Sequence, residues 1–534
     1  MNGAQALFKA LTDAGLDTCF ANPGTSEMQL VYEIGNTEGV RAVLCLEENV
    51  VTGAADGYGR MAGKPAFTLL HVGSGLANGM ANLHNAGRGN TPIVNVVGAN
   101  ATYHQPNFAE HEFINGNITD IARVVSHWAH QAKSASDLAV LGAMAARYSR
   151  IGAGKICTVV APTNCHWDPA VAPPVPALPL ETPKVSPQTI QEVVTLLTNG
   201  KKTGILLGSH ALYGDGLELA GRIAEKTGAN LLGETIPARL ARGEGRVPVE
   251  LIWYLPEQAV PQLQKYEQLI LVGALFPVTT FAYKGKPVIK VPATCLVTTL
   301  ATVDHDILAA LADLAKAVSA PPQPAARRKR STGAPPKGAL TDVAIGQSLG
   351  QLMPENAILV NDSVTTEPAL YEGTEGARAH DYLYAGCGGA IGGGLPVALG
   401  AAVACPDRKT VVLEGDGSGM YTPQSLWSMA REKADITVVV LKNDSYAILN
   451  IELARAREGE PNSKMLSLLE IGNPSLDWVK LAEAQGVPAT RATTAEEFHQ
   501  QFEAAMSSQG PHLIEAQIVQ DIKPMIDKIH NERK

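Results

Sequence analysis

Two short apolar runs in the last third of the chain, Thr410–Glu414 and Ile436–Lys442, constrain the fold most strongly. Both are rich in β-branched residues and are bounded by glycine or polar residues, which is typical of parallel strands buried on both faces. Residues 423–433 between them read as one crossover helix. We therefore expect a parallel sheet in which the carboxyl ends of the two strands lie side by side, at the edge where such sheets bind ligands.

Polar residues follow both strands at this edge. Asp416 stands directly after the first strand, and Asn443 ends the second. Carboxylate and amide oxygens suit Mg²⁺, which takes few protein ligands and completes its shell with phosphate oxygens. Gly417 and Ser418 would let a diphosphate approach the backbone closely. The pattern predicts a site for a magnesium ion and a diphosphate.

This pattern resembles the fingerprint of thiamine diphosphate (ThDP) enzymes, in which a metal ion anchors the diphosphate of the cofactor. The resemblance implies that Asp416 and Asn443 are side-chain ligands of Mg²⁺ and that Ser445 is a backbone-carbonyl ligand. A second Gly-Asp-Gly, around Asp215, has Arg242 at the corresponding distance and does not match. Many relatives have an asparagine at the position of Lys442. Because this residue precedes the ligand and is not itself a ligand, we still expect a metal site here.

The glycine-rich segment that contains Gly389 and Ile391 is the next expected part of the site. By resemblance, Gly389 contacts the aminopyrimidine, Ile391 is the wedge that keeps the cofactor bent, and Thr365 lies on the diphosphate side. A β-branched side chain suits a wedge because its rotamers are restricted. The cofactor-binding residues expected in the last third of the chain are Thr365, Gly389, Ile391, Asp416, Gly417, Ser418, Asn443, Ser445, Tyr446, Ala447 and Ile448.

Glu48 closes a buried strand and opens an apolar helix near the start of the chain. From this segment alone, a helix N-terminal charge and a buried functional acid are equally good interpretations. The resemblance favours the second, because the spacing to Tyr58 matches the activating glutamate of ThDP enzymes and selects Glu48 over Glu47. In that family the acid shares a proton with N1′ of the aminopyrimidine, which promotes loss of the thiazolium C2 proton.

Two further segments resemble the benzoylformate decarboxylase branch of this family. The segment Phe20–Glu27 resembles the loop over the cofactor, and Thr25 occupies the position of a serine that binds the substrate carboxylate. His71 occupies the position of a histidine that faces the substrate. The residues expected to serve the site from this part of the chain are Asn22, Pro23, Gly24, Thr25, Glu48, His71, Gly75 and Asn78.

The chain departs from that branch at two places. A second catalytic histidine would be expected in the segment Val272–Tyr283, which contains none. In the loop after Tyr446, Ile448 would narrow the substrate pocket and Glu452 would place an acid near it. The polar loop His104–Glu112 is one candidate for a substitute proton donor, since functional residues favour loops.

The domain organisation follows from length and pattern. A chain of 534 residues is typical of about three domains. We expect an α/β protein with three doubly wound parallel-sheet domains, of the ThDP-enzyme type, and a proline-flanked basic run, Arg327–Arg330, read as an exposed connector. The expected domains are pyrimidine-binding (residues 1–165), middle (186–318) and diphosphate-binding (340–534).

Composition narrows the cellular setting. The net charge of −9 argues against a nucleic acid or an anionic membrane as partner. No apolar run reaches the ~18 residues of a membrane span, and the N-terminus begins as an amphipathic helix rather than a signal peptide. Seven scattered cysteines without a CxxC indicate reduced thiols and a cytoplasmic protein.

Three functions remain after this reading. The resemblance implies first a ThDP- and Mg²⁺-dependent decarboxylase of a 2-oxo acid. It implies second a carboligase similar to acetolactate synthase, which the missing middle-domain histidine favours because slower protonation leaves the carbanion available. The third, a non-catalytic homologue, is disfavoured because Glu48, Asp416 and Asn443 are all present.

The resemblance also bears on partners and on a second cofactor. It implies a homo-oligomer, at least a dimer and often a tetramer, whose active site lies between subunits. FAD stays open but is not predicted, because the basic segment Ala238–Val249 does not match the pattern expected of the synthases.

Overall fold

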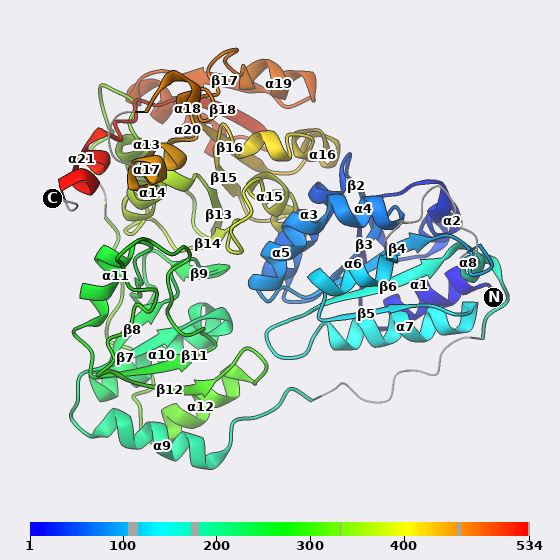
Figure 1. Ribbon diagram of the computed structural model, residues 1–534, viewed down its shortest axis with the longest axis horizontal. Coiled ribbons are helices and arrows are strands. Elements are labelled where there is room, and N and C mark those ends of the chain that lie inside the picture. The colour runs from blue at the N-terminus through cyan, green and yellow to red at the C-terminus, as the bar shows by residue number, and fades with distance from the viewer. Residues whose placement is uncertain (105–115, 172–180, 332, 457–460, 532–534) are drawn as a thin grey trace.

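The computed structural model describes residues 1–104, 116–171, 181–331, 333–456 and 461–531. It contains three sheets, each packed against helices, and the chain runs through them in order from the N-terminus at the right of Figure 1. The fold is the expected α/β architecture of three parallel-dominated sheets. The domain boundaries themselves stay predictions.

The first sheet is parallel throughout, with strand order β2-β1-β3-β4-β6-β5. Its strands are β1 (Thr18–Asn22), β2 (Arg41–Leu44), β3 (Ala66–Leu70), β4 (Ile93–Ala99), β5 (Trp128–Gln131) and β6 (Ile156–Pro162). The helices around it are α1 (Gly3–Asp13), the 3₁₀ turn η1 (Thr25–Glu27), α2 (Met28–Asn36), α3 (Glu48–Ala62), α4 (Val72–Asn78), α5 (Met80–Arg88), α6 (Ile118–Val125), α7 (Ala135–Tyr148) and α8 (Thr163–Trp167).

The middle sheet is also parallel, with order β10-β8-β7-β11-β12. Its strands are β7 (Thr203–Leu207), β8 (Asn230–Gly233), β10 (Glu250–Leu251), β11 (Gln268–Val272) and β12 (Leu296–Ala301). The helices beside it are α9 (Pro187–Thr198), η2 (Ser209–Leu212), α10 (Gly214–Thr227), α11 (Pro256–Leu263) and α12 (Ile307–Ala317).

The third sheet has order β17-β18-β16-β15-β13-β14-β9 and is parallel except at its β9 edge. Its strands are β9 (Arg239–Arg242), β13 (Ala357–Asp362), β14 (His380–Tyr384), β15 (Thr410–Gly415), β16 (Ile436–Lys442), β17 (Ala489–Ala492) and β18 (His512–Gln517). Its helices are α13 (Asp342–Leu352), η3 (Val364–Thr366), α14 (Glu367–Gly373), α15 (Gly394–Ala404), η4 (Gly419–Tyr421), α16 (Ser425–Glu432), α17 (Ala447–Ala456), α18 (Ser463–Leu466), α19 (Trp478–Ala484), α20 (Ala495–Ser507) and α21 (Lys523–Asn531).

The expected β-α-β unit is confirmed in this third sheet. β15 and β16 pair in parallel, with Thr410 opposite Ile436, and α16 connects them. Every residue of β16 is buried, as the run of β-branched residues predicted. The third sheet also takes a strand from outside its expected domain: β9 lies within the expected middle domain but pairs antiparallel with β14.

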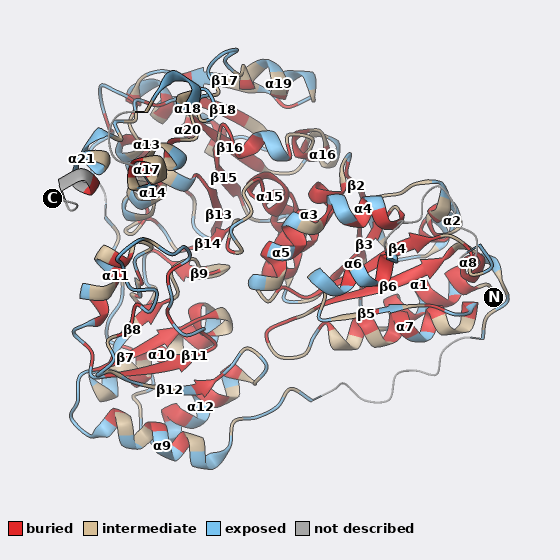
Figure 2. Ribbon diagram, in the orientation of Figure 1, coloured by how far each residue is buried: buried red, intermediate tan, exposed pale blue. Residues whose placement is uncertain are grey.

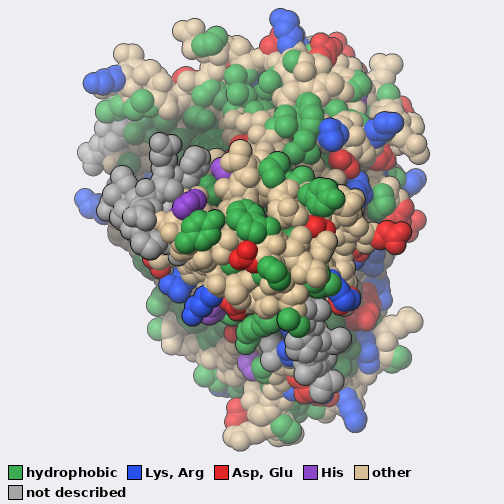
Figure 3. Space-filling model, turned by 90° about the vertical axis from the view of Figure 1, so that its right-hand side faces the viewer, with side chains coloured by type: hydrophobic (Ala, Val, Ile, Leu, Met, Phe, Trp, Pro, Cys, Tyr) green, Lys and Arg blue, Asp and Glu red, His purple; other side chains and the backbone are tan. Residues whose placement is uncertain are grey.

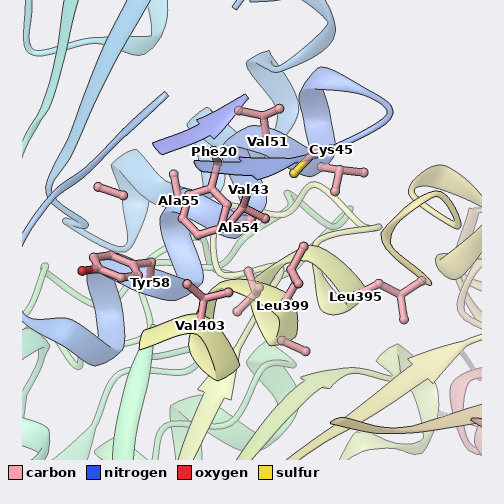
Figure 4. Packing of buried hydrophobic residues seen from close by; sticks show 14 of the residues in the cluster. Phe20, Val43, Cys45, Val51, Ala54, Ala55, Tyr58, Leu395, Leu399 and Val403 are labelled. Carbon is pink, nitrogen blue, oxygen red and sulfur yellow. The ribbon is translucent and has the colours of Figure 1, made fainter. Parts of the chain in front are cut away.

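Helices α3 and α15 bring the first and third sheets together. Both helices are almost entirely buried (Figure 2), and Figure 4 shows their apolar side chains meeting, with Ala54 and Tyr58 on one helix and Leu399 on the other. Their backbones approach closely: a Cβ built on Gly400 would lie 1.8 Å from the carbonyl oxygen of Ala54, and one on Gly57 would lie 2.0 Å from that of Val397. Only glycine fits at such a crossing.

A buried ion pair links all three parts of the chain. Arg60 Nε donates to Asp56 Oδ1 at 2.8 Å, and both side chains are almost fully buried. Arg60 Nη1 also donates to the carbonyl oxygens of Ala238 (3.1 Å) and Tyr384 (2.6 Å). Because Ala238 precedes β9 and Tyr384 ends β14, one guanidinium ties the first domain to the middle and third.

The basic run between the last two domains is only partly the exposed connector that we expected. Arg327 and Lys329 are exposed, but Arg327 pairs with Glu218 and Arg330 donates to the carbonyl oxygen of Gly350 at 2.7 Å. No disulfide joins the cysteines, all of which lie in described residues. None of the described helices has the length and apolar character needed to cross a membrane.

Candidate functional site

Asp416 lies at the carboxyl ends of β15 and β16, buried to 2% exposure. Its Oδ2 accepts hydrogen bonds from the backbone N–H groups of Asn443 (3.1 Å) and Asp444 (2.7 Å). Burial raises the pKa of Asp416 to about 6, although these two N–H groups lower it. Among the described residues no lysine or arginine forms an ion pair with this carboxylate, so a bound cation would relieve the cost of burying it.

The loop after β16 is shaped around Asp416. Asn443 Oδ1 accepts a hydrogen bond from the Ser445 N–H at 3.0 Å, which fixes the Asn443 side chain within the loop. Lys442 is the residue that departs from the family pattern. Its ammonium group donates to Asp444 Oδ1 and to Ser475 Oγ (2.6 Å). The structure thus brings Asp416, Asn443 and Ser445 together, as a metal site would need.

Gly417 is required where the loop meets Tyr446. A Cβ built on Gly417 would lie 2.5 Å from Cε1 of the Tyr446 ring, so only glycine leaves room for that ring. Ser418 is buried and its hydroxyl donates to the Glu414 carboxylate and to the carbonyl oxygen of Asp362 (3.1 Å). Ala447 and Ile448 follow as the first residues of α17.

The glycine-rich loop between β14 and α15 is held by the first domain. Asn85 of α5 bonds both sides of Ala390, donating to its carbonyl oxygen at 2.8 Å and accepting from its N–H at 3.2 Å. Gly389 is exposed and adopts a φ of +95°, a conformation that favours glycine. Ile391 and Thr365 are both half-buried.

Two buried carboxylates that the sequence analysis did not predict lie next to this loop, and one of them accepts hydrogen bonds from it. Asp362 and Glu414 are directly opposite each other on β13 and β15. Asp362 Oδ2 accepts from the N–H groups of Gly392 (2.8 Å) and Gly394 (3.2 Å), and burial raises its pKa to about 6. Burial, and then the nearby Asp362, raise the pKa of Glu414 well above its usual range.

Glu48 is the first residue of α3 and is buried to 8% exposure. Its Oε2 accepts a hydrogen bond from Asn78 Nδ2 at 3.1 Å, and its Oε1 would lie 2.8 Å from a Cβ built on Gly75. Glu47 instead caps the helix by accepting from the Val50 N–H at 3.1 Å. Adjacent glutamates therefore have separate roles: Glu47 holds the helix end, and Glu48 lies against two other predicted site residues.

His71 pairs with an acid that was not predicted. Its Nδ1 lies 2.8 Å from Oε2 of Glu27, a side chain with no exposed surface. The same oxygen accepts from the Gly24 N–H at 2.8 Å, and a Cβ on Gly24 would collide with the imidazole at 2.2 Å. In the sequence, only its place in the loop Phe20–Glu27 connects Glu27 with the predicted site.

The remaining predicted residues of the first domain are only partly buried or exposed. Asn22 ends β1, Pro23 is half-buried, and Thr25 is exposed at the start of η1. Of the polar loop His104–Glu112, His104 is exposed, and residues 105–112 lie outside the described residues.

Backbone conformation marks two of the turns in this region. Val72, which follows His71, has a φ of +38°, and Val364, which precedes Thr365, has a φ of +54°. β-branched residues rarely adopt positive φ, and such strain gathers at functional sites.

Comparison with known proteins identifies relatives over nearly the whole chain. A family model described as "Thiamine pyrophosphate enzyme, N-terminal TPP binding domain" matches residues 1–123, and its C-terminal counterpart matches residues 370–516. A Mycobacterium tuberculosis protein named "Putative acetolactate synthase large subunit IlvX" is 45% identical over 96% of this chain and 98% of its own length. Benzoylformate decarboxylase of Pseudomonas aeruginosa is 28% identical over 97% and 99%.

A solved structure shares the fold. The ThDP-dependent 4-hydroxybenzoylformate decarboxylase of Rhodococcus jostii RHA1 superposes with a TM-score of 0.83, covering 98% of this chain and 100% of its own, at 24% identity.

Proposed function

Because the chain belongs to the family of ThDP-dependent enzymes that includes acetolactate synthases and 2-oxo acid decarboxylases, we propose that it removes CO₂ from a 2-oxo acid with ThDP and Mg²⁺. The observation that carries the proposal is the buried Asp416 carboxylate, which the Asn443 loop surrounds and with which no lysine or arginine of the described chain forms an ion pair. Such a carboxylate at the strand ends fits a divalent ion that carries a diphosphate.

The residues in place fit the cofactor. Asp416, Asn443 and the Ser445 carbonyl would hold Mg²⁺, and Gly417 with Ser418 would receive the diphosphate. Glu48 would hold a proton at N1′ of the aminopyrimidine, since it is buried and Asn78 fixes its carboxylate. When bound, ThDP supplies the electron sink that makes loss of CO₂ feasible.

The first domain would bind and orient the substrate. His71 is oriented by Glu27, in the way that a carboxylate commonly sets the tautomer and direction of a functional histidine. We expect the His71 side chain, which is 21% exposed, to face the 2-oxo acid, and Thr25 to bind its carboxylate. His71→Ala should therefore slow turnover while leaving ThDP binding intact.

Acetolactate-synthase-like ligation is the second candidate. The name and 45% identity of the mycobacterial relative favour it, as does the lack of a histidine in Val272–Tyr283. Both candidates share the loss of CO₂ and differ in whether the remaining carbon then takes a proton or attacks a second carbonyl.

Assembly and location are part of the proposal. We infer a homodimer or homotetramer in the cytoplasm, acting on a small-molecule 2-oxo acid. Exposed hydrophobic side chains stand close in sequence to predicted site residues: Met28 is 50% exposed, Leu46 46% and Tyr421 53%. Figure 3 shows further hydrophobic side chains on the surface of one face, scattered among charges of both signs. Sedimentation velocity across a concentration series measures the assembly directly, and a monomer at all concentrations would contradict it.

The deciding experiment is a panel of 2-oxo acids (pyruvate, branched and aromatic), supplied with ThDP and Mg²⁺, with and without an acceptor aldehyde. CO₂ and carbon–carbon-bonded product are followed separately. CO₂ release matched by free aldehyde supports the decarboxylase, whereas ligated product in excess of aldehyde supports the second candidate. Failure of every acid to release CO₂ would reject both.

A further inference from the structure

A cluster of charged and hydroxyl side chains connects the middle domain to α17, the helix that follows the Asn443 loop. Glu452 Oε1 accepts a hydrogen bond from the Tyr283 hydroxyl at 3.3 Å, and Arg455 Nε lies 3.7 Å from the same oxygen. Arg455 Nη1 also donates to Glu257 Oε1 at 3.0 Å, and its guanidinium lies 5.1 Å from the centre of the Tyr283 ring. Glu452 is therefore fixed between side chains from two domains.

The helix places Glu452 one turn from a residue of the predicted site. Ile448, Glu452 and Arg455 are spaced by four and then three residues, so they share one face of α17. Glu452 lies one turn, about 6 Å, beyond Ile448, the residue expected to narrow the substrate pocket. The Glu452 side chain is 28% exposed, so it is in contact with solvent.

The two carboxylates of the cluster differ in environment. Burial alone would raise the pKa of Glu257, but hydrogen bonds from its own backbone N–H and from Arg455 lower it overall, with help from Lys286. For Glu452, burial raises the pKa, and Arg455 and Tyr283 only partly oppose it. Arg455 thus pairs mainly with Glu257. Of the two carboxyl groups, Glu452 is therefore the one better able to carry a proton. Two carboxylates separated in this way are a common arrangement for acid–base chemistry.

Other titratable side chains also lie near Glu452. Burial, followed by Glu452 and Tyr254, raises the pKa of Tyr283, so its hydroxyl keeps its proton and remains a donor. Helix α21 also packs against α17, and its charged residues Lys523 and Asp527 are exposed.

We propose that Glu452 is the proton donor that completes the decarboxylation, with Tyr283 and Arg455 as its positioning residues. The inference rests on the proposed function and fills the place of the histidine that the segment Val272–Tyr283 lacks. The Glu452 carboxylic acid gives its proton to the substrate carbon that has lost CO₂, whose electron pair forms the new C–H bond. The resulting carboxylate regains a proton from water.

The kinetic test separates the two steps. In Glu452→Gln loaded with ThDP and Mg²⁺, we expect first-turnover CO₂ release within about twofold of wild type, and aldehyde release slower by about 10²-fold, the usual effect of a lost general acid. Glu452→Asp should recover part of the aldehyde rate, and Tyr283→Phe should cause a smaller decrease. Glu503→Gln, an exposed glutamate on α20, is the matched control and should behave as wild type.

A second test needs no cofactor. Carboxyl ¹³C resonances of the cofactor-free protein are followed against pH, and Glu452→Gln identifies the signal of Glu452. We expect this carboxyl to titrate above the ordinary glutamate value, and Tyr283→Phe to shift its pKa upward, because the variant loses a hydrogen bond to the charged form.

The outcomes distinguish this inference from the proposed function. If wild type releases no CO₂ from any 2-oxo acid, the proposed function fails and the proton donor fails with it. If wild type releases CO₂ and Glu452→Gln forms aldehyde at the wild-type rate, only the assignment of Glu452 is overturned. An ordinary Glu452 titration that Tyr283→Phe leaves unchanged would overturn it as well.

Discussion

At the scale of single residues, adjacent glutamates at the start of α3 offer the sharpest test of the site. Glu48→Gln should slow exchange of the C2 proton of bound ThDP with deuterated water by about 10²-fold or more, because the activating acid is lost. Proton NMR of the quenched cofactor measures the exchange. Glu47→Gln is the matched control: it weakens the helix cap, at a cost of about 1 kcal/mol, but should leave exchange intact. Normal exchange in Glu48→Gln would remove its assigned role.

Asp362 predicts a pH dependence of stability. Its folded-state pKa of about 6 lies above the reference value of 3.8, so the folded protein holds a proton that the unfolded chain has released between these values. This contribution to stability is present below pH 3.8 and is lost as the pH rises to about 6. In cofactor-free protein, the stability of Asp362→Asn relative to wild type should therefore rise by about 2 kcal/mol between pH 4 and pH 7.

Urea unfolding at a series of pH values measures that difference. Asp313→Asn, an exposed acid on α12, serves as control and should run parallel to wild type. Parallel curves for Asp362→Asn as well would show that Asp362 is not held protonated by the fold.

At the scale of elements, the sequence predicted those helices and strands that are determined by the local pattern of apolar and polar residues. The buried strands β15 and β16 were found within a residue of their expected ends, because an apolar β-branched run between polar residues has few other folded states. The helices α4 and α5 meet at Gly79, where a Cβ would lie 2.7 Å from the Thr52 side chain. That contact depends on tertiary packing, which no local pattern contains.

The same limit applies to the site. Asp416 and Asn443 could be picked from the sequence because each stands at the end of a recognisable strand, and Glu48 because its spacing to Tyr58 resembles that of the family's activating glutamate. Glu27 and the Asp362–Glu414 pair could not, because their meaning comes from neighbours distant in sequence: His71 for the first, and β13 beside β15 for the second.

The close crossing of α3 and α15 predicts that replacing a glycine by alanine destabilises the protein at the crossing but not elsewhere. Gly57→Ala and Gly400→Ala should each destabilise the protein by about 1–3 kcal/mol, because the added methyl group meets backbone atoms of the other helix. Gly35→Ala in α2 is the matched control: nothing lies within 4 Å of its Cβ position, and alanine should stabilise by roughly 0.5–1 kcal/mol. Denaturant unfolding measures all three. Equal effects at the three positions would refute the close crossing.

At the scale of the whole molecule, cofactor binding should raise stability through the metal site. With ThDP at 100 times its Kd and excess Mg²⁺, the free energy of unfolding should rise by about 2.7 kcal/mol, and a chelator should reverse the gain. Asp416→Ala should lose the magnesium-dependent part of the shift in Tm. Asp215→Ala, in the other Gly-Asp-Gly, should keep it, because Asp215 lies in the first turn of α10. An unchanged shift in Asp416→Ala would exclude Asp416 as a ligand.

The meeting of α3 with α15 also has a consequence for biosynthesis. Helix α3 is complete at residue 62, but the surface that it buries against, on α15, ends only at residue 404. At 5–20 residues per second, a ribosome needs roughly 17–70 s to make the intervening chain. Throughout that interval the apolar side of α3 is without its native cover. A nascent chain stalled before α15 should consequently recruit chaperones at α3, and release them once the later helix emerges.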